Sequence, residues 1–562
     1  MAIERFVDHA IPRTSVSRAA PLRSGYRSLV GRALALLVVA ATPGAIPASA
    51  EGADWPQWGG RDGRNMVSAE TGLPDSFVPG DKLPSGGGID PATTRNVRWT
   101  ARLGSAAYGN LTVATGKVLV GTDDLTVDED PRFERTRGGL VKCFDAADGK
   151  LLWQLVVPER TQYPKGLLYG HQYLGTCSSP TVDGDRVYVV TSSAEVICLD
   201  LDGQRDGNDG PFVDEGKFFA AKDRPPVEVQ PGDGDIIWRY DLIDQLGVRP
   251  HDTTSCSVLI HGDLVYLSTS NGVDGAHAKV LAPDVPAFIA LDKHTGRLAA
   301  FENEGLSSRL FHCQWSSPSL GVVDGRPLVF LGGGDGVCYA FEALAEAPAQ
   351  PVPLRKVWSF DCNPPHYRMR DGKLIPYYDG DKRKHNSPNK NDGQYVGPSQ
   401  IIATPVFEAG RVYVAIGQDP AHGRGRGMLH AIDAAGSGDI TISGRLWSYD
   451  GLDRSIGTVA VADGLVYALD VAGRLHCVDA RTGQPCWVHE TKAEAWGSPL
   501  VADGKVFFGN QKSFFIMRHG REPVVLSEIR LGSPVYSSAI AANGVLYVAS
   551  QKYLWAVAKD AP

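Results

Sequence analysis

The stretch of sequence that decides the fold is residues 457–487, which read GTVAVADGLVYALDVAGRLHCVDARTGQPCW. It holds a small residue, an Asp463-Gly464 turn, the pair Val466-Tyr467, an apolar segment ending in Asp-Ala, a second turn with Gly483, and a tryptophan. The same phrase returns about every 40 residues along the chain. Repeats of about this length, each holding four short strands, are typical of β-propeller blades.

Eight copies of the phrase can be aligned. The small residue that opens each copy is Asn110, Ser179, Ser257, Ser317, Thr404, Thr458, Ser498 or Ser538. The large residue of each outer strand is Trp99, Trp153, Trp238, Phe301, Trp358, Trp447, Trp487 or Leu526, and we expect these side chains to be wedges between blades. Trp99 precedes the first inner strand, and the last copy has no outer strand of its own. The pattern predicts an all-β, eight-bladed propeller of four-stranded antiparallel blades, in which an N-terminal strand completes the last blade.

The first 50 residues have the order of a secretory signal: arginines, an apolar run at 33–41, and the small residues Ala48-Ser49-Ala50. The run is shorter than the ~20 residues of a membrane span. We expect cleavage near Ala50, no membrane span, and a periplasmic or secreted protein. The predicted organisation is a signal peptide at 1–50, an extension at 51–95 that packs on the ring through Trp55 and Trp58, and the propeller at 96–562.

Charge and cysteine usage restrict the partners. The net charge is −8, and residues 1–50 hold six arginines but only two acidic residues, so the remainder is more acidic still. An acidic surface argues against nucleic acid as a partner. The chain has nine cysteines, an odd number, and four of them recur at the start of a third strand, where a small buried side chain is expected: Cys143, Cys198, Cys338 and Cys477.

Long insertions interrupt the phrase almost entirely on one face of the predicted ring. This face carries the loops that join one blade to the next and the second strand to the third, and function usually lies on such loops. The insertion at 201–235 is the exception and should project from the opposite face. The insertions of the loop-rich face are 123–139, 158–176, 241–254, 271–286, 302–314, 361–400 and 418–427.

These insertions carry the candidate binding residues. The seven histidines in them are His171, His251, His277, His312, His366, His385 and His422. Their spacings match no short metal-ligand pattern, so the sequence predicts no metal site. Tyr108, Trp315, Trp496 and Tyr536 precede the small residues that open the inner strands, and they suit either a binding surface at the channel mouth or a plug. The hydroxyls of those small residues either contact a ligand or, as we favour, bond to backbone.

The insertion at 361–400 mixes basic and aromatic residues. Arg368 and Arg370 belong to it, and the insertion suits a lid over an anionic ligand or an acidic partner, or a solvated loop. Together the candidate residues of the ligand or partner face are His171, His251, His312, Trp315, His366, Arg368, Arg370, His385, His422, Trp496 and Tyr536. No residue is assigned a catalytic role.

The phrase resembles the pyrroloquinoline-quinone-type repeat, as in Cys477-Val478-Asp479-Ala480-Arg481-Thr482-Gly483 and Leu291-Asp292-Lys293-His294-Thr295-Gly296. The resemblance implies the eight-bladed propeller of the quinoprotein alcohol dehydrogenase-like superfamily. That superfamily includes quinone-dependent dehydrogenases and non-catalytic propellers such as the outer-membrane assembly lipoprotein. The dehydrogenases typically carry two adjacent cysteines over the cofactor, and this chain has no Cys-Cys pair and no Cys-x-x-Cys-His haem motif.

The sequence therefore favours a non-catalytic extracytoplasmic module that binds a protein or small molecule through its loop-rich face, with no cofactor. The alternative is a dehydrogenase of alcohols or sugars that uses pyrroloquinoline quinone and calcium.

Overall fold

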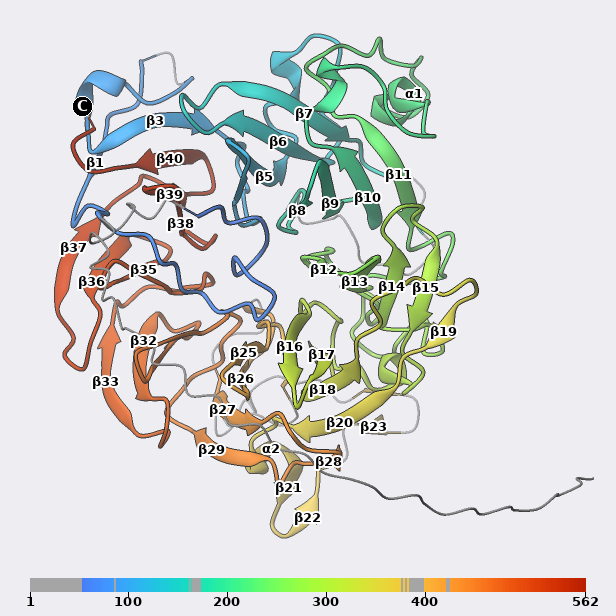
Figure 1. Ribbon diagram of the computed structural model, residues 1–562, viewed down its shortest axis with the longest axis vertical. Coiled ribbons are helices and arrows are strands. Elements are labelled where there is room, and N and C mark those ends of the chain that lie inside the picture. Colours follow the sequence, from blue (N-terminus) through green and yellow to red (C-terminus); the bar gives the residue numbers. More distant parts are fainter. Residues whose placement is uncertain are drawn as a thin grey trace, which may run out of the picture. The chain divides into compact units, whose positions relative to one another are not determined.

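A computed structural model describes residues 53–84, 87–160, 163, 173–375, 378–379, 382–383, 399–420 and 425–561, which form short strands joined by tight turns and by longer loops. The predicted signal peptide lies outside the described residues. The strands form eight four-stranded antiparallel units arranged in a ring (Figure 1), so the predicted eight-bladed propeller is confirmed.

The first four blades contain the following strands. Blade one has β4 (Thr112–Ala114), β5 (Lys117–Asp123), β6 (Gly139–Asp145) and β7 (Leu151–Val157). Blade two has β8 (Thr181–Asp183), β9 (Arg186–Val190), β10 (Glu195–Asp200) and β11 (Ile236–Asp241). Blade three has β12 (Leu259–His261), β13 (Leu264–Ser268), β14 (Phe288–Asp292) and β15 (Leu298–Phe301). Blade four has β16 (Ser319–Val323), β17 (Arg326–Gly332), β18 (Val337–Glu342) and β20 (Lys356–Asp361).

The remaining four blades contain the following strands. Blade five has β25 (Val406–Glu408), β26 (Arg411–Ile416), β27 (Met428–Asp433) and β29 (Arg445–Tyr449). Blade six has β30 (Ala460–Ala462), β31 (Leu465–Leu469), β32 (Arg474–Asp479) and β33 (Pro485–Glu490). Blade seven has β34 (Leu500–Ala502), β35 (Lys505–Gly509), β36 (Phe514–Arg518) and β37 (Val525–Ile529). Blade eight has β38 (Ile540–Ala542), β39 (Val545–Ala549), β40 (Tyr553–Val557) and β3 (Val97–Arg102).

A few small elements decorate the ring. Blades three and four each gain a parallel fifth strand, β19 (Val352–Pro353) and β28 (Gly438–Asp439). The other elements are β1 (Val78–Pro79), β2 (Thr94–Arg95), β21 (Met369–Arg370), β22 (Lys373–Leu374), β23 (Tyr378–Asp379), β24 (Lys382–Arg383), the helices α1 (Glu215–Phe219) and α2 (Pro365–Arg368), and the 3-10 turns η1 (Pro91–Thr93), η2 (Val127–Glu129), η3 (Gly203–Arg205) and η4 (Leu306–Arg309). No helix in the described part of the chain is both long and apolar enough to cross a bilayer.

The ring closes as the sequence predicts. Strand β3 pairs antiparallel with β40, with Thr100 opposite Trp555, although the two strands lie near opposite ends of the chain. Figure 1 shows β3 beside β40, so blade eight is completed from the N-terminal side. This pairing gives β40 a neighbour on each side and removes an exposed edge strand.

In six of the eight blades, the outer-strand tryptophan fastens the blade to the next one. Their indole Nε1 atoms donate to backbone carbonyls of the following blade at 2.9–3.0 Å, in the pairs Trp99–Ala146, Trp153–Leu201, Trp238–Lys293, Trp358–Ala434, Trp447–Ala480 and Trp487–Gly520. All six side chains are buried. The predicted wedge role is confirmed for these six tryptophans, and the accepting carbonyl belongs to the turn that follows the third strand.

The recurrent cysteines, Cys143, Cys198, Cys338 and Cys477, are also buried as predicted.

Residues 55–70, which we call the hub segment, run across the centre of the ring (Figure 1). Backbone hydrogen bonds join this segment to inner strands of different blades: Trp55 to Val113, Pro56 to Val182, Asp62 to Leu320, Gly63 to Phe407 and Met66 to Val501. It also approaches the turns between first and second strands, because Glu70 accepts from the amides of Asn543 and Gly544. The hub segment therefore lies on the face opposite the long insertions.

Candidate functional site

A ring of polar side chains encircles the hub on the loop-rich side. In six neighbouring pairs, the backbone amide of one inner strand donates to the side-chain oxygen of the next blade at 2.7–3.2 Å: Ser179 to Ser257, Ser257 to Ser317, Thr404 to Thr458, Thr458 to Ser498, Ser498 to Ser538 and Ser538 to Asn110. The aligned small residues of the repeat are thus inter-blade fasteners, in agreement with the backbone-bonding interpretation favoured from the sequence. All of these residues except Ser179 also line the hollow at the centre of the ring.

Three aromatic rings stack on one side of this channel. Trp496 and Tyr536 lie nearly parallel with their centroids 4.2 Å apart, and Tyr108 stacks with them at 5.7 and 6.0 Å. Trp315 lies across the channel, where its indole donates to the Thr253 carbonyl at 2.8 Å. Parallel rings at these distances form a flat apolar wall of the kind that holds planar ligands.

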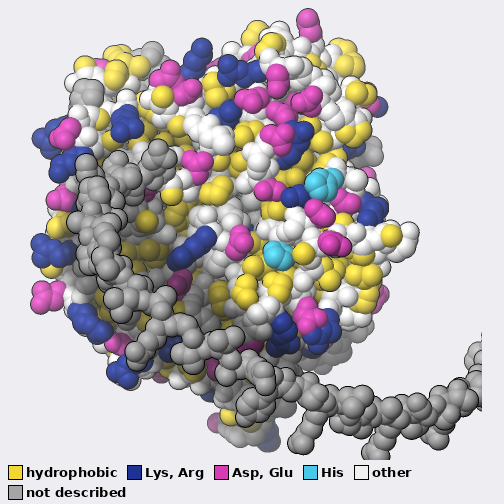
Figure 2. All heavy atoms as spheres, viewed as in Figure 1, with side chains coloured by type: hydrophobic (Ala, Val, Ile, Leu, Met, Phe, Trp, Pro, Cys, Tyr) yellow, Lys and Arg dark blue, Asp and Glu magenta, His cyan; other side chains and the backbone are white. Residues whose placement is uncertain are grey.

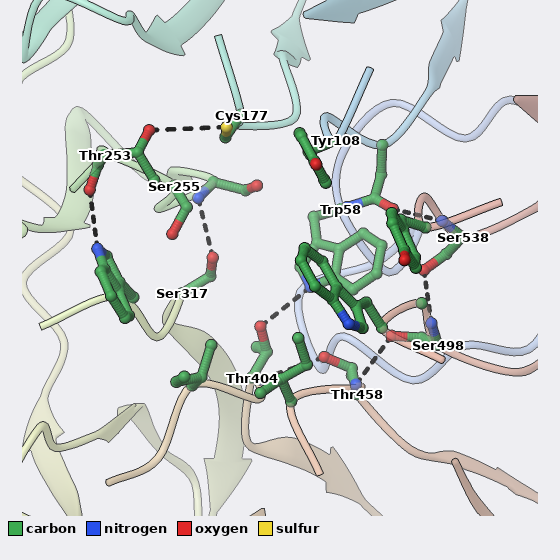
Figure 3. Close-up of a pocket in the computed structure, with 18 of the residues that line it drawn as sticks. Trp58, Tyr108, Cys177, Thr253, Ser255, Ser317, Thr404, Thr458, Ser498 and Ser538 are labelled. Atoms are coloured by element: carbon green, nitrogen blue, oxygen red, sulfur yellow. Dashed lines mark hydrogen bonds between the residues drawn. The ribbon is translucent and has the colours of Figure 1, made fainter. Parts of the chain in front are cut away.

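The floor of the hollow is Trp58 from the hub segment (Figure 3). Its indole Nε1 donates to Thr404 Oγ1 at 3.0 Å, and its side chain is 6% exposed. Because the hub segment enters from the opposite face, the channel does not run through the ring here. The result is a pocket of about 280 Å³ that opens on the loop-rich face, and we call it the hub pocket.

The described lining of the hub pocket carries carboxylates but neither Lys nor Arg. Its two acidic members are Asp252 and Asp419. Burial, together with the smaller effect of the neighbouring Asp419 carboxylate, raises the pKa of Asp252 to about 7. Burial also raises the pKa of the Cys177 thiol to about 11, so this thiol is protonated at neutral pH and a poor nucleophile.

Behind this wall three imidazoles meet. His251, His277 and His312 have ring centroids 4.4–4.8 Å apart. His312 also contacts the Trp315 ring at a centroid distance of 4.9 Å. The histidines therefore adjoin the hub pocket through Trp315 and through Asp252, which follows His251 in the chain.

The structure divides the residues proposed from the sequence into separate places. Trp315, Trp496 and Tyr536 line the hub pocket, and His251 and His312 form the cluster behind it. His366 and Arg368 lie in α2, away from the pocket lining, and Arg368 pairs with Asp361 at 2.7 Å. His171, His385 and His422 lie outside the described residues, as do the Arg370 side chain and most of the predicted lid at 361–400.

Sequence reasoning missed several members of this site. Asp252 and Asp419 were not singled out, and Trp58 was expected only to fix the N-terminal extension to the ring. His277 was noted among the loop histidines but was not selected for the ligand face. A signal was available for Asp252, which adjoins His251 in an insertion of the loop-rich face. Nothing in the sequence around Asp419 links it to those histidines.

The described lining does not suit pyrroloquinoline quinone, the cofactor that the resemblance implies. This quinone carries three carboxylates, and such anions are normally held by Arg or Lys. The described lining presents Asp252 and Asp419 instead. The aromatic wall could stack on the quinone ring, but the charges of the described lining oppose it.

Comparison with known proteins finds both an outer-membrane assembly factor and alcohol dehydrogenases among the similar proteins. The family model described as "Outer membrane protein assembly factor BamB" matches residues 89–273 and 425–518. Among curated proteins, the chain is 23% identical over 419 residues to the quinohemoprotein alcohol dehydrogenase ADH IIB of Pseudomonas putida, a match that covers 69% of this chain and 50% of the relative. It is 30% identical over 135 residues to the 1-butanol dehydrogenase (cytochrome c) of Thauera butanivorans, covering 21% of this chain and 18% of the relative. The chain thus matches about half the length, or less, of these curated relatives.

Solved structures give similar neighbours. BamB from Moraxella catarrhalis superposes with a TM-score of 0.46 at 13% identity, covering 82% of this chain and 96% of that one. The quinohemoprotein alcohol dehydrogenase of Comamonas testosteroni gives a TM-score of 0.43 at 12% identity, covering 90% of this chain and 80% of that one. The repeat pattern, the eight closed blades and the sequence matches agree with one another. The chain belongs to the superfamily of β-propellers built from pyrroloquinoline-quinone-type repeats.

Proposed function

We propose that this protein is an extracytoplasmic, non-catalytic binding module that holds a small planar ligand in the hub pocket. The observation that carries the proposal is the stack of Tyr108, Trp496 and Tyr536 over the closed floor made by Trp58. A closed hollow with an apolar wall and a polar rim is the usual form of a small-molecule site. The carboxylates of Asp252 and Asp419 favour a ligand that is neutral or positively charged.

The chemistry of the described lining supports binding over catalysis. The hub hydroxyls already accept backbone amides, as at Thr458 and Ser498, which leaves them poorly placed to act as nucleophiles. The Cys177 thiol, which is protonated at neutral pH, is likewise a poor nucleophile. The extracytoplasmic location rests on the signal-like sequence at 1–50.

The pocket wall can be tested by truncating the stack. A panel of planar aromatic compounds, neutral and cationic, is screened by thermal shift against the wild-type protein. Binding compounds should lose at least about tenfold in affinity in the Trp496→Ala or Tyr536→Ala variant, because a buried aromatic anchor contributes well over 1 kcal/mol. The matched control is Phe212→Ala, an aromatic truncation in the insertion at 201–235, outside the pocket lining. If no compound binds in a manner that depends on Trp496 or Tyr536, the pocket is not the ligand site.

A quinone-dependent dehydrogenase is the second candidate function. It is favoured by Asp252, whose pKa of about 7 suits a general base, and by the curated dehydrogenases that the chain resembles. The decisive experiment is reconstitution with pyrroloquinoline quinone and Ca²⁺. We expect no stoichiometric quinone absorption and no dye-linked oxidation of alcohols or sugars. A one-to-one quinone spectrum with turnover would replace the binding proposal.

A further inference from the structure

Three loops around blade three converge on one point of the loop-rich face. They are the loops at 242–258, 269–287 and 302–318, and they carry His251, His277 and His312 in that order. Backbone pairing holds them together: Pro250 bridges to Asn271, Gly272 bridges to Cys313, and the Val273 amide donates to the His312 carbonyl at 2.9 Å. The histidines are therefore positioned by a fixed backbone.

Gly272 makes this convergence possible. A Cβ at this position would lie 2.7 Å from the Cβ of His251 and 2.9 Å from the His312 carbonyl oxygen. Only glycine lets the three loops approach so closely. Two cluster residues also adopt left-handed backbone conformations, with φ of 55° at Asp252 and 54° at His277. Such strain is concentrated at functional sites.

The imidazoles are oriented with ring nitrogens toward one another. His251 Nδ1 lies 2.8 Å from the Val273 carbonyl oxygen, so Nδ1 carries the proton and donates, and Nε2 presents a lone pair. His277 Nε2 lies 3.1 Å from His312 Nε2. One ring nitrogen from each of the three histidines lies within 4.8 Å of the corresponding nitrogens of the other two.

The shortest of these distances matches that between two ligands of one metal ion. At a Zn–N length of about 2.0–2.1 Å, two nitrogens of a tetrahedral site are separated by about 3.3 Å. The separation of 3.1 Å between His277 and His312 is close to that value. A donated ring Nδ1–H to a backbone carbonyl, as at His251, is also the usual way to orient a metal-binding imidazole.

Negative charge lies beside the imidazoles. Asp252 is 7% exposed, and within the described structure no hydrogen-bond donor reaches its Oδ1, which lies 3.6 Å from His251 Nε2. Its Oδ2 lies 3.9 Å from His312 Nε2, and Asp419 lies 3.8 Å from His312 Nδ1. Burying carboxylates is costly unless a cation balances them.

We propose that His251, His277 and His312, with the Asp252 carboxylate, bind a divalent transition-metal ion of the Zn²⁺ type. Imidazole nitrogens with one carboxylate oxygen are a donor set that zinc and its first-row neighbours take readily, whereas calcium and magnesium prefer oxygen ligands. Asp419 lies next to the ion and contributes charge. The site is separate from the proposed aromatic wall but shares Asp252 and Asp419 with the hub pocket. A bound ion would therefore lie behind the pocket wall. Its positive charge would offset the negative charge that these two carboxylates present to the pocket. The inference does not depend on the proposed ligand.

The test uses the full-length protein stripped of metal by a chelator and dialysed. Titration with Zn²⁺ alone should give one equivalent bound per chain by elemental analysis, and it should raise the thermal unfolding midpoint. Titration with Co²⁺ should give the intense visible absorption of a tetrahedral nitrogen and oxygen site. His277→Gln and His312→Gln should each weaken the affinity by at least about tenfold. Asp252→Asn should weaken it as well, and unfolding curves of the metal-free variants establish that they fold.

The matched control is His294→Gln, which removes a histidine whose side chain is 65% exposed and which lies outside the cluster. This variant should bind Zn²⁺ and Co²⁺ as the wild type does. The proposal is overturned if the wild type binds less than one equivalent, or if the Gln variants in the cluster bind as tightly as the control. In that case His277 and His312 are simply hydrogen-bonded to each other.

Discussion

Arg64 shows how a single side chain connects separate parts of the ring. Its guanidinium is fully buried and donates to three carbonyls, those of Pro318 at 3.0 Å, Val258 at 2.7 Å and Trp58 at 2.5 Å. Burial lowers its pKa to about 10, which still leaves it charged at neutral pH. One residue of the hub segment thus satisfies acceptors from blades three and four and holds the segment that carries the pocket floor.

Replacing Arg64 with Met should destabilise the protein strongly. The variant keeps a side chain of similar length but leaves three buried carbonyls without their donor, and each such loss costs about 1–3 kcal/mol. We expect the free energy of unfolding to fall by about 3 kcal/mol or more, measured by urea denaturation. Arg61→Met is the control, because Arg61 is 55% exposed and pairs with Glu408 at the surface, so it should change stability by about 1 kcal/mol at most. Equal effects in the two variants would show that Arg64 is not a structural connection.

The element that repeats most faithfully is the turn after the third strand together with the outer-strand tryptophan of the preceding blade. In blade six this turn includes Ala480 and Gly483, and it receives Trp447 of blade five. Gly483 has a φ of 72°, and a Cβ there would lie 2.8 Å from the Trp447 ring. The ring cannot easily retreat, because it is 7% exposed and hydrogen-bonded to Ala480.

Alanine variants of two glycines distinguish the cost of backbone strain from the cost of crowding the Trp447 ring. Gly464 has a φ of 74°, and a Cβ there meets no atom within 4 Å, whereas the Cβ at Gly483 would strike the Trp447 ring. Gly464→Ala should cost about 1–2 kcal/mol from the left-handed conformation alone. Gly483→Ala should cost a further 1–3 kcal/mol or so from overpacking. Urea denaturation of both variants measures the difference, and equal costs would mean that the tryptophan contact contributes nothing.

At the scale of the whole molecule, the hub segment converts a ring with a channel into a ring with a closed pocket. Innermost strands are edge strands, and their outward N–H groups would otherwise face the channel. The amides of Val113, Val182, Leu320, Phe407 and Val501 instead donate to carbonyls of the hub segment at 2.8–2.9 Å. Side chains of both signs are spread over the face seen in Figure 2.

Hydrogen–deuterium exchange can test this arrangement. In the full-length protein, the five amides that donate to the hub segment should exchange slowly although their strands are edge strands. In a variant that lacks residues 53–70 they should exchange faster by at least about tenfold, because their acceptors are removed. Peptides from the central strand β39 are the reference and should remain protected in a folded variant. Unchanged protection at the five amides would show that the hub segment does not cover them.

The sequence by itself determined the eight blades, their outer tryptophans, the small residues of the inner strands and the closure of blade eight by the strand around Trp99. These features depend on local periodicity and on turn chemistry that each repeat carries within about 40 residues. The tertiary structure alone decided where the insertions meet. The histidine cluster joins His251, His277 and His312 from three loops, Asp419 comes from blade five, and Trp58 reaches the pocket from the opposite face. No short spacing encodes such contacts, because the ring geometry brings these residues together only after the blades have closed.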